Sequence, residues 1–147
     1  MILGLFGVLL ALSTSVFAGD EASKGNTYVT STITLKSKAM KPGSKGQVLI
    51  TLKPEKGIHI NINPPIDVKF DSNGIVDSRG KLEVPRSKKT DYLDDTAPIR
   101  QFFTLKKKIK QGTMTIKGVL TYYFCSDAEG WCTKFKQPFD LAVTVKK

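Results

Sequence analysis

Apolar and polar residues alternate along most of this chain. Apolar side chains recur at every second position at about residues 28–36, 47–53, 58–62, 103–109, 114–124 and 139–145. Such alternation places apolar side chains on one face of a segment and polar ones on the other, which is typical of a strand that covers a core on one side. After the N-terminal segment, no window keeps a helical period of 3.6 residues for three turns. We therefore predict an all-β chain.

Turn signals separate these segments at short intervals. Pro, Gly and Asn mark turns at residues 41–43, 54–57, 64–65, 72–74, 79–80 and 111–112. With 147 residues and 16.2 kDa the chain has room for one domain. About seven or eight short strands in such a length indicate an immunoglobulin-like antiparallel β-sandwich. A small closed barrel is the alternative.

The N-terminal residues are typical of an export signal. Residues 2–12 are all apolar or Gly, and the small-residue site Val16-Phe17-Ala18 follows before the first charges. This order predicts a secretory signal peptide over residues 1–18, cleaved after Ala18, and a mature domain over residues 19–147. The apolar run is shorter than the roughly 20 residues of a spanning helix, so we expect no stable membrane anchor. The alternative for this segment is a buried helix or strand.

The two cysteines are expected to form a disulfide at the neck of a hairpin. Six residues lie between Cys125 and Cys132, with Gly130 as the turn residue, and exported thiols meet an oxidising environment. A structural staple that closes a loop of this size contributes about 2.5 kcal/mol. The other interpretation is a redox pair that cycles between dithiol and disulfide. Asp127 and Glu129 place negative charge near both sulfurs, which disfavours the thiolate and slows spontaneous reaction.

Residues 85–98 interrupt the alternation. They are mostly polar, are bracketed by Pro85 and Pro98, and carry Tyr92 and Leu93 as isolated apolar side chains. An ordinary surface loop and a lid over a site both fit this composition.

Charge and composition exclude several functions. The net charge of +10 comes from 20 Lys and 3 Arg, whereas base recognition favours Arg with interleaved aromatic residues, so we expect no nucleic-acid partner. The densest cluster, Lys106-Lys107-Lys108 with Lys110, is expected to face solvent, with attraction to anionic lipid or an acidic partner as the alternative. With two cysteines and His59 as the lone histidine, we expect no metal site, no cofactor and no triad hydrolase.

Three segments carry a family resemblance. Residues 57–61 (GIHIN), residues 90–100, and residues 125–132 (CSDAEGWC) resemble a glycine-aromatic-histidine strand, a cap loop and a cysteine loop. They are similar to those of the N-terminal periplasmic domain of the thiol:disulfide interchange protein DsbD, also described as the disulfide bond corrector domain family. The similarity extends over about residues 27–146. Two departures are the six residues between the cysteines, where the family has five, and residues 133–136 in place of a proline-rich stretch.

The resemblance implies a periplasmic thiol:disulfide exchange module, an oxidoreductase component. Cys132 corresponds to the cysteine that forms the mixed disulfide and Cys125 to the one that resolves it. Asp91, Tyr92 and Leu93 correspond to the cap loop, with Tyr92 as the aromatic cover of the pair. The implied partners are a thioredoxin-like redox domain or membrane thiol reductase as electron donor and oxidised periplasmic proteins as acceptors. The competing hypothesis is a secreted immunoglobulin-like binding or structural protein with a purely structural disulfide.

Overall fold

The computed structural model describes residues 25–147, which form nine β-strands and no helix. The strands are β1 (Val29–Leu35), β2 (Ala39–Met40), β3 (Lys45–Pro54), β4 (Ile58–Asn61), β5 (Asp67–Phe70), β6 (Val76–Glu83), β7 (Ile99–Leu105), β8 (Gly112–Ser126) and β9 (Trp131–Val145). In this part of the chain no helix is long and apolar enough to span a membrane. The predicted signal peptide, residues 1–18, lies outside the described residues.

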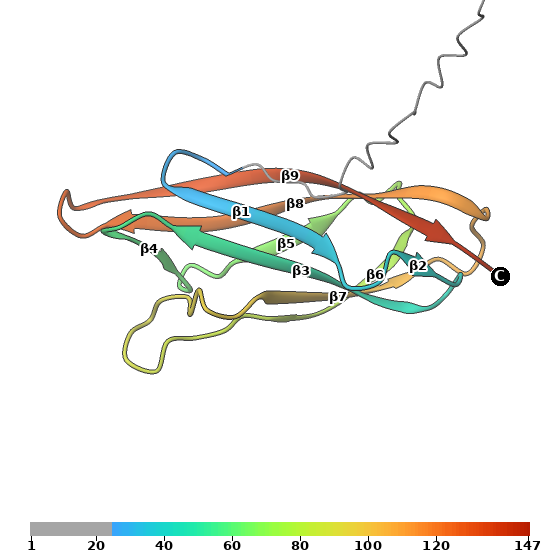
Figure 1. Cartoon of the computed structure of the whole chain (residues 1–147), viewed down its shortest axis with the longest axis horizontal. Helices are drawn as coiled ribbons and strands as arrows, with labels where there is room; N and C mark the ends of the chain where they lie inside the picture. Colours follow the sequence, from blue (N-terminus) through green and yellow to red (C-terminus); the bar gives the residue numbers. More distant parts are fainter. Residues whose placement is uncertain (1–24) are drawn as a thin grey trace, which may run out of the picture.

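The strands form two separate sheets packed face to face (Figure 1). One sheet has the order β1-β3-β7-β6. The other has the order β2-β9-β8-β4, with β5 also paired to β8. All pairings are antiparallel except the short parallel contact of β2 with β9. The predicted all-β, immunoglobulin-like sandwich is therefore confirmed, and the chain does not close into the alternative barrel.

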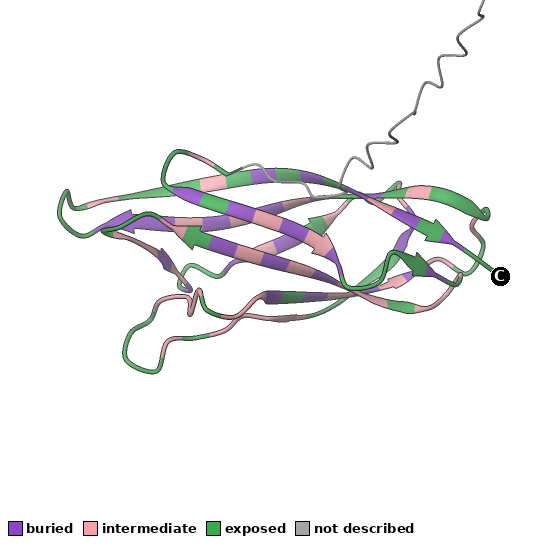
Figure 2. Ribbon diagram, in the orientation of Figure 1, coloured by how far each residue is buried: buried purple, intermediate pink, exposed green. Residues whose placement is uncertain are grey.

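The core lies between the two sheets and follows the alternation of the sequence. In β1 every second residue from Val29 to Leu35 is buried, and the strands in Figure 2 show the same alternation of buried and less buried positions. Aromatic side chains from both sheets meet in this core, among them Phe103 and Phe139, which both contact Phe70. Ser31 adds a polar link, because its Oγ donates a hydrogen bond of 2.6 Å to Gln137 Oε1 in the opposite sheet. Burial of these alternating side chains is the main stabilising term of the fold.

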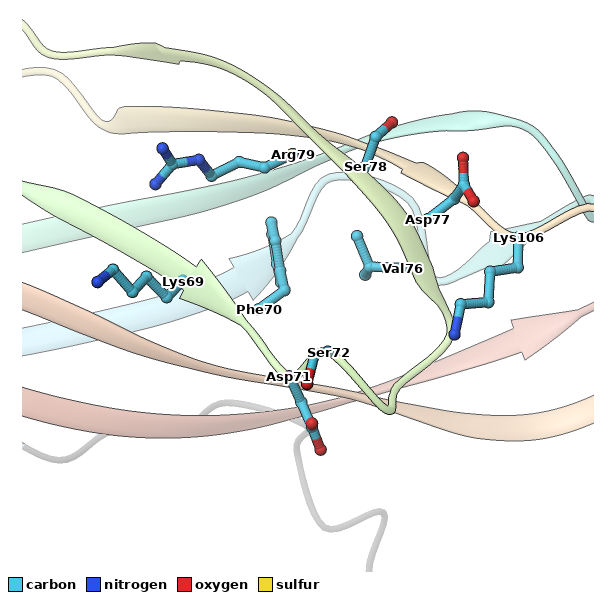
Figure 3. Close-up of a pocket in the computed structure, with 9 residues that line it drawn as sticks. All are labelled: Lys69, Phe70, Asp71, Ser72, Val76, Asp77, Ser78, Arg79 and Lys106. Atoms are coloured by element: carbon cyan, nitrogen blue, oxygen red, sulfur yellow. The ribbon is translucent and has the colours of Figure 1, made fainter.

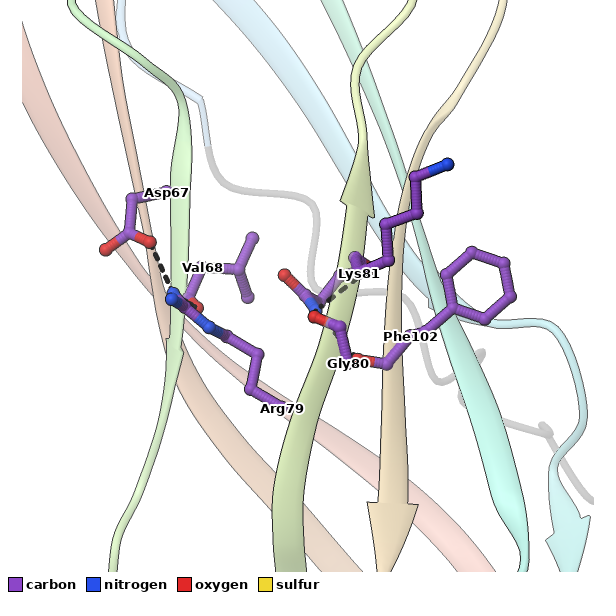
Figure 4. Close-up of polar contacts among 7 residues, drawn as sticks. Asp67, Val68, Arg79, Gly80, Lys81 and Phe102 are labelled. Carbon is purple, nitrogen blue, oxygen red and sulfur yellow. Dashed lines mark hydrogen bonds and ion pairs between the residues drawn. The ribbon is translucent and has the colours of Figure 1, made fainter.

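The edge formed by β5 and β6 was not predicted. A hollow of about 470 Å³ lies here, with Phe70 and Val76 between the two strands (Figure 3). Arg79 of β6 closes part of the same edge, because its guanidinium pairs with the Asp67 carboxylate and donates a hydrogen bond of 2.9 Å to the Val68 carbonyl (Figure 4). This contact connects the two sheets at their rims.

The turn predicted at residues 79–80 is wrong, because both residues lie inside β6. The register of β6 against β7 shifts between Arg79 and Leu82, and a Cβ on Gly80 would lie 2.9 Å from the Cβ of Phe102. Gln101 Nε2 donates a hydrogen bond of 3.0 Å to the Gly80 carbonyl. Glycine therefore serves a close backbone approach within an irregular strand, not a turn.

Tyr122 is the largest fully buried side chain of β8. Its hydroxyl accepts a hydrogen bond of 3.0 Å from Asn26 Nδ2, and its ring contacts Phe124 and Phe135. Burial raises the pKa of Tyr122 to about 12, and the hydrogen bond from Asn26 opposes part of this shift. The neutral phenol is therefore favoured in the folded state.

This burial predicts a specific loss of stability in alkali. An unfolded tyrosine ionises near pH 10, so between about pH 10 and about pH 12 the unfolded state binds fewer protons than the folded state and the free energy of unfolding falls. Tyr122→Phe removes the ionising group. Urea unfolding from pH 8 to pH 11.5 should show the wild type losing stability relative to Tyr122→Phe only above about pH 10. A constant difference between the two proteins across this range would contradict the account.

Candidate functional site

The two cysteines lie directly opposite one another in the β8–β9 hairpin. They are joined by a disulfide, their Cα atoms are 4.1 Å apart, and they are register partners. The turn beyond them ends at Gly130, whose φ of 68° is in the left-handed region, and Gly130 N donates a hydrogen bond of 2.9 Å to the Ser126 carbonyl. The predicted pairing, hairpin and turn residue are all present.

Both cysteines belong to the outer face of the five-stranded sheet. Tyr122 and Phe124 of β8 point into the core. The residues that alternate with them, which include Cys125, therefore face away from the core. On β9, Trp131 packs against the core and Cys132 is exposed. Cys125 is only 5% exposed although it is on the outer face. The two sulfur-bearing residues therefore differ sharply in accessibility.

Edge strand β4 shelters Cys125. His59 is the register partner of Cys125 on this side, and its side chain is 14% exposed. Two residues further along the same face, Asn61 Nδ2 donates a hydrogen bond of 3.1 Å to Cys125 Sγ. Cys125 thus lies between its disulfide partner on β9 and the polar side chains of His59 and Asn61 on β4.

The cap loop extends the sheet beyond β4. Leu93 N donates to the Ile60 carbonyl at 2.9 Å and Ile62 N donates to the Asp91 carbonyl at 3.3 Å, so residues 91–93 pair with the free edge of β4. The Tyr92 ring stacks on the His59 ring with their centroids 3.8 Å apart. Tyr92 therefore covers His59, the register partner of Cys125. Asp91 is exposed and contributes its backbone carbonyl.

The two carboxylates of the hairpin turn have partners. Asp127 Oδ2 is 3.2 Å from His59 Nδ1, and Glu129 Oε2 accepts a hydrogen bond from Trp131 Nε1. Asp127 thereby ties the turn to β4 on the Cys125 side. These contacts hold the negative charges at the rim of the site.

Sequence reasoning singled out the cysteines and residues 91–93 but missed the contact of Asn61 with Cys125. Alternation places His59 and Asn61 on one face of their strand, yet it does not say which strand lies beside them. Asn61 and Cys125 are 64 positions apart in sequence, and only the order of strands in the sheet brings them together.

Among residues 25–147, the other hollows and acidic side chains do not form a second candidate centre. The hollow of Figure 3 mixes Lys69, Lys106 and Arg79 with Asp71 and Asp77, and it contains neither cysteine nor histidine. Within residues 25–147 no group of three or more His, Cys, Asp or Glu side chains is placed to hold a metal ion.

Comparison with known proteins gives only distant likenesses. No protein-family model matches the chain, and no curated protein matches it significantly. The N-terminal domain of DsbD from Neisseria meningitidis in the reduced form is similar at 16% identity and a TM-score of 0.38, over 76% of this chain and 86% of that one. A chain of the Coh-OlpA-Doc918 type I cohesin–dockerin complex from Clostridium thermocellum has the same identity and TM-score, over 78% and 97%. Neither likeness decides a function.

The stacking of Tyr92 on His59 predicts a kinetic effect. Tyr92→Ala removes the ring that covers His59 and should open the side of the disulfide nearest Cys125. We expect dithiothreitol to gain access to Cys125 in the folded variant in addition to the exposed Cys132, and so to reduce the disulfide about twofold faster than in the wild type, because exchange rates depend on access to the sulfur. Tyr92→Phe keeps the ring and should react at the wild-type rate. Alkylation and mass spectrometry follow the reduction over time. Equal rates for all three proteins would show that Tyr92 does not cover the disulfide.

Proposed function

We propose that this chain is an exported thiol:disulfide exchange module that works through Cys125 and Cys132. The observation that carries the proposal is the asymmetry of the disulfide: it lies on an outer sheet face with Cys132 exposed and Cys125 5% exposed. Exchange requires an approach to one chosen sulfur, and this arrangement offers Cys132 while sheltering Cys125.

Each sulfur has its own part in the exchange. In the reduced module, the Cys132 thiolate attacks a partner disulfide, forms a mixed disulfide and releases the partner's second sulfur as a thiolate. The Cys125 thiolate then attacks Cys132 Sγ, which re-forms the Cys125–Cys132 bond and releases the reduced partner. Two electrons pass to the partner. A dithiol donor reverses the sequence by attacking Cys132 and displacing Cys125.

Asn61 supports this assignment. When a donor thiolate attacks Cys132, negative charge develops on Cys125 Sγ, and the Asn61 amide already donates a hydrogen bond to that atom. A hydrogen bond to the charged form of a group stabilises that form. In the part of the chain that the structure describes, Asn61 Oδ1 is buried without a hydrogen-bond partner.

The hairpin itself argues against a purely structural disulfide. β8 and β9 are 15 residues each and pair along their whole length, so the chain around the cysteines is already held by a backbone ladder. Closing a short loop adds about 2.5 kcal/mol, a modest gain for a hairpin fixed in this way.

The partner classes follow from the resemblance of the cysteine loop to the DsbD N-terminal family. We propose a thioredoxin-like domain or membrane thiol reductase as the donor and oxidised periplasmic proteins as acceptors. The same resemblance, together with the predicted signal peptide, supports a periplasmic location.

The proposal is tested by trapping the mixed disulfide. The probe is a thioredoxin with its attacking cysteine alone, activated as a mixed disulfide with thionitrobenzoate. Reduced Cys125→Ala should form a stable covalent complex through Cys132, and reduced Cys132→Ala should react at least about tenfold more slowly, because its remaining cysteine is sheltered. The wild type should form the complex only transiently, because Cys125 resolves it.

Non-reducing electrophoresis and peptide mapping read out the complexes, and circular dichroism confirms that each variant is folded. Equal trapping by the two variants, or a wild-type complex that persists, would contradict the assigned roles and favour the structural disulfide.

A further inference from the structure

A groove on the outer sheet face begins one side-chain repeat from the disulfide. Tyr123 and Lys134 are register partners, and each lies two residues along its strand from a cysteine on the same face. Two residues along a strand span about 6.6–6.8 Å. From this pair a groove of about 430 Å³ continues along β8 and β9 to Lys136, with Lys69 of β5 on its other wall. We call this feature the basic groove.

The basic groove is positively charged. Lys69, Lys134 and Lys136 are all exposed, and in residues 25–147 none of them forms an ion pair. Lys134 Nζ lies 5.7 Å from the centroid of the Tyr123 ring, which forms part of the floor. The groove's one acidic lining residue, Asp67, is paired with Arg79 from the opposite sheet (Figure 4). Three lysines without an ion-pair partner in residues 25–147 therefore line the groove, and Lys134 is the one nearest the disulfide along the β8–β9 ladder.

Negative charge lies on the other side of the disulfide. Asp127 and Glu129 are in the hairpin turn beyond the cysteines. Along the β8–β9 ladder the side-chain charge thus changes from negative at the hairpin turn to positive at the basic groove. The disulfide lies between these two regions. A polypeptide that presents its cysteine to Cys132 would meet lysines on one side and carboxylates on the other.

We propose that the basic groove binds an acidic segment that flanks the reactive cysteine of a partner polypeptide, and so selects acidic partners for exchange at Cys132. The inference rests on the proposed exchange function and adds which class of partner that exchange would favour. Complementary charge near a reactive site raises the rate of encounter, and the effect weakens with ionic strength. An elongated groove that runs along two strands suits an extended peptide.

The test compares three disulfide-linked peptide dimers whose cysteine is flanked by two Glu, two Gln or two Lys. Reduced wild type should exchange with the Glu peptide about tenfold faster than with the Lys peptide at low salt, with the preference falling as NaCl rises. Lys134→Glu/Lys136→Glu should abolish or reverse that preference, measured as the rates with the Glu and Lys peptides each divided by the same variant's rate with the Gln peptide.

The matched control is Lys107→Glu/Lys108→Glu. It changes the net charge equally, but these residues precede β8 at the end opposite to Cys125, so it should keep the wild-type preference. Equal wild-type rates with the Glu and Lys peptides, or the same effect from both double variants, would overturn the groove proposal.

Two further results separate the possible failures. If the Gln peptide exchanges normally and no charge preference exists, the exchange function stands and the groove proposal is wrong. If no peptide exchanges with the folded protein, the exchange function itself fails. Loss of binding to phosphatidylglycerol vesicles in Lys134→Glu/Lys136→Glu, with unchanged peptide rates, would assign the groove to lipid and overturn the proposal.

Discussion

The antiparallel ladder between β8 and β9 is the constraint on which the site depends. Its register places Cys125 opposite Cys132 and, by the alternation of side chains, puts both on the outer face while Tyr122 and Phe124 fill the core. The same ladder carries Tyr123 and Lys134 to the next position along that face. A shift of one residue in the pairing would separate the cysteines and turn the aromatic side chains to solvent.

The difference between the two cysteines arises from the edges of the sheet. Cys125 is in the strand that β4 covers, and β4 is in turn extended by residues 91–93 of the cap loop. Cys132 is in β9, and within residues 25–147 no strand pairs with β9 on its other side at this level, since β2 contacts only its far end. Edge strands present unpaired backbone and exposed side chains. Of the two residues joined by the disulfide, Cys125 is therefore sheltered and Cys132 is accessible.

Some of this architecture could be predicted from the sequence and some could not. Alternation identified β8 and β9 and the inward parity of Tyr122, and the spacing with Gly130 identified the hairpin. β6 was missed because it is an edge strand whose residues from Asp77 to Lys81 are all exposed, so its two faces do not differ in polarity. The contact of Asn61 with the sulfur depends on strand order across a long sequence separation, which local patterns do not encode.

The reduction potential of the Cys125–Cys132 pair tests the central claim most directly. The folded mature protein would be equilibrated with a series of dithiothreitol or glutathione redox buffers, and the oxidised fraction measured by alkylation and mass spectrometry. A pair built for exchange should titrate reversibly above about −300 mV while the fold is retained. A bond that stays closed below about −300 mV, or opens only when the protein unfolds, would contradict the account and mark the disulfide as structural.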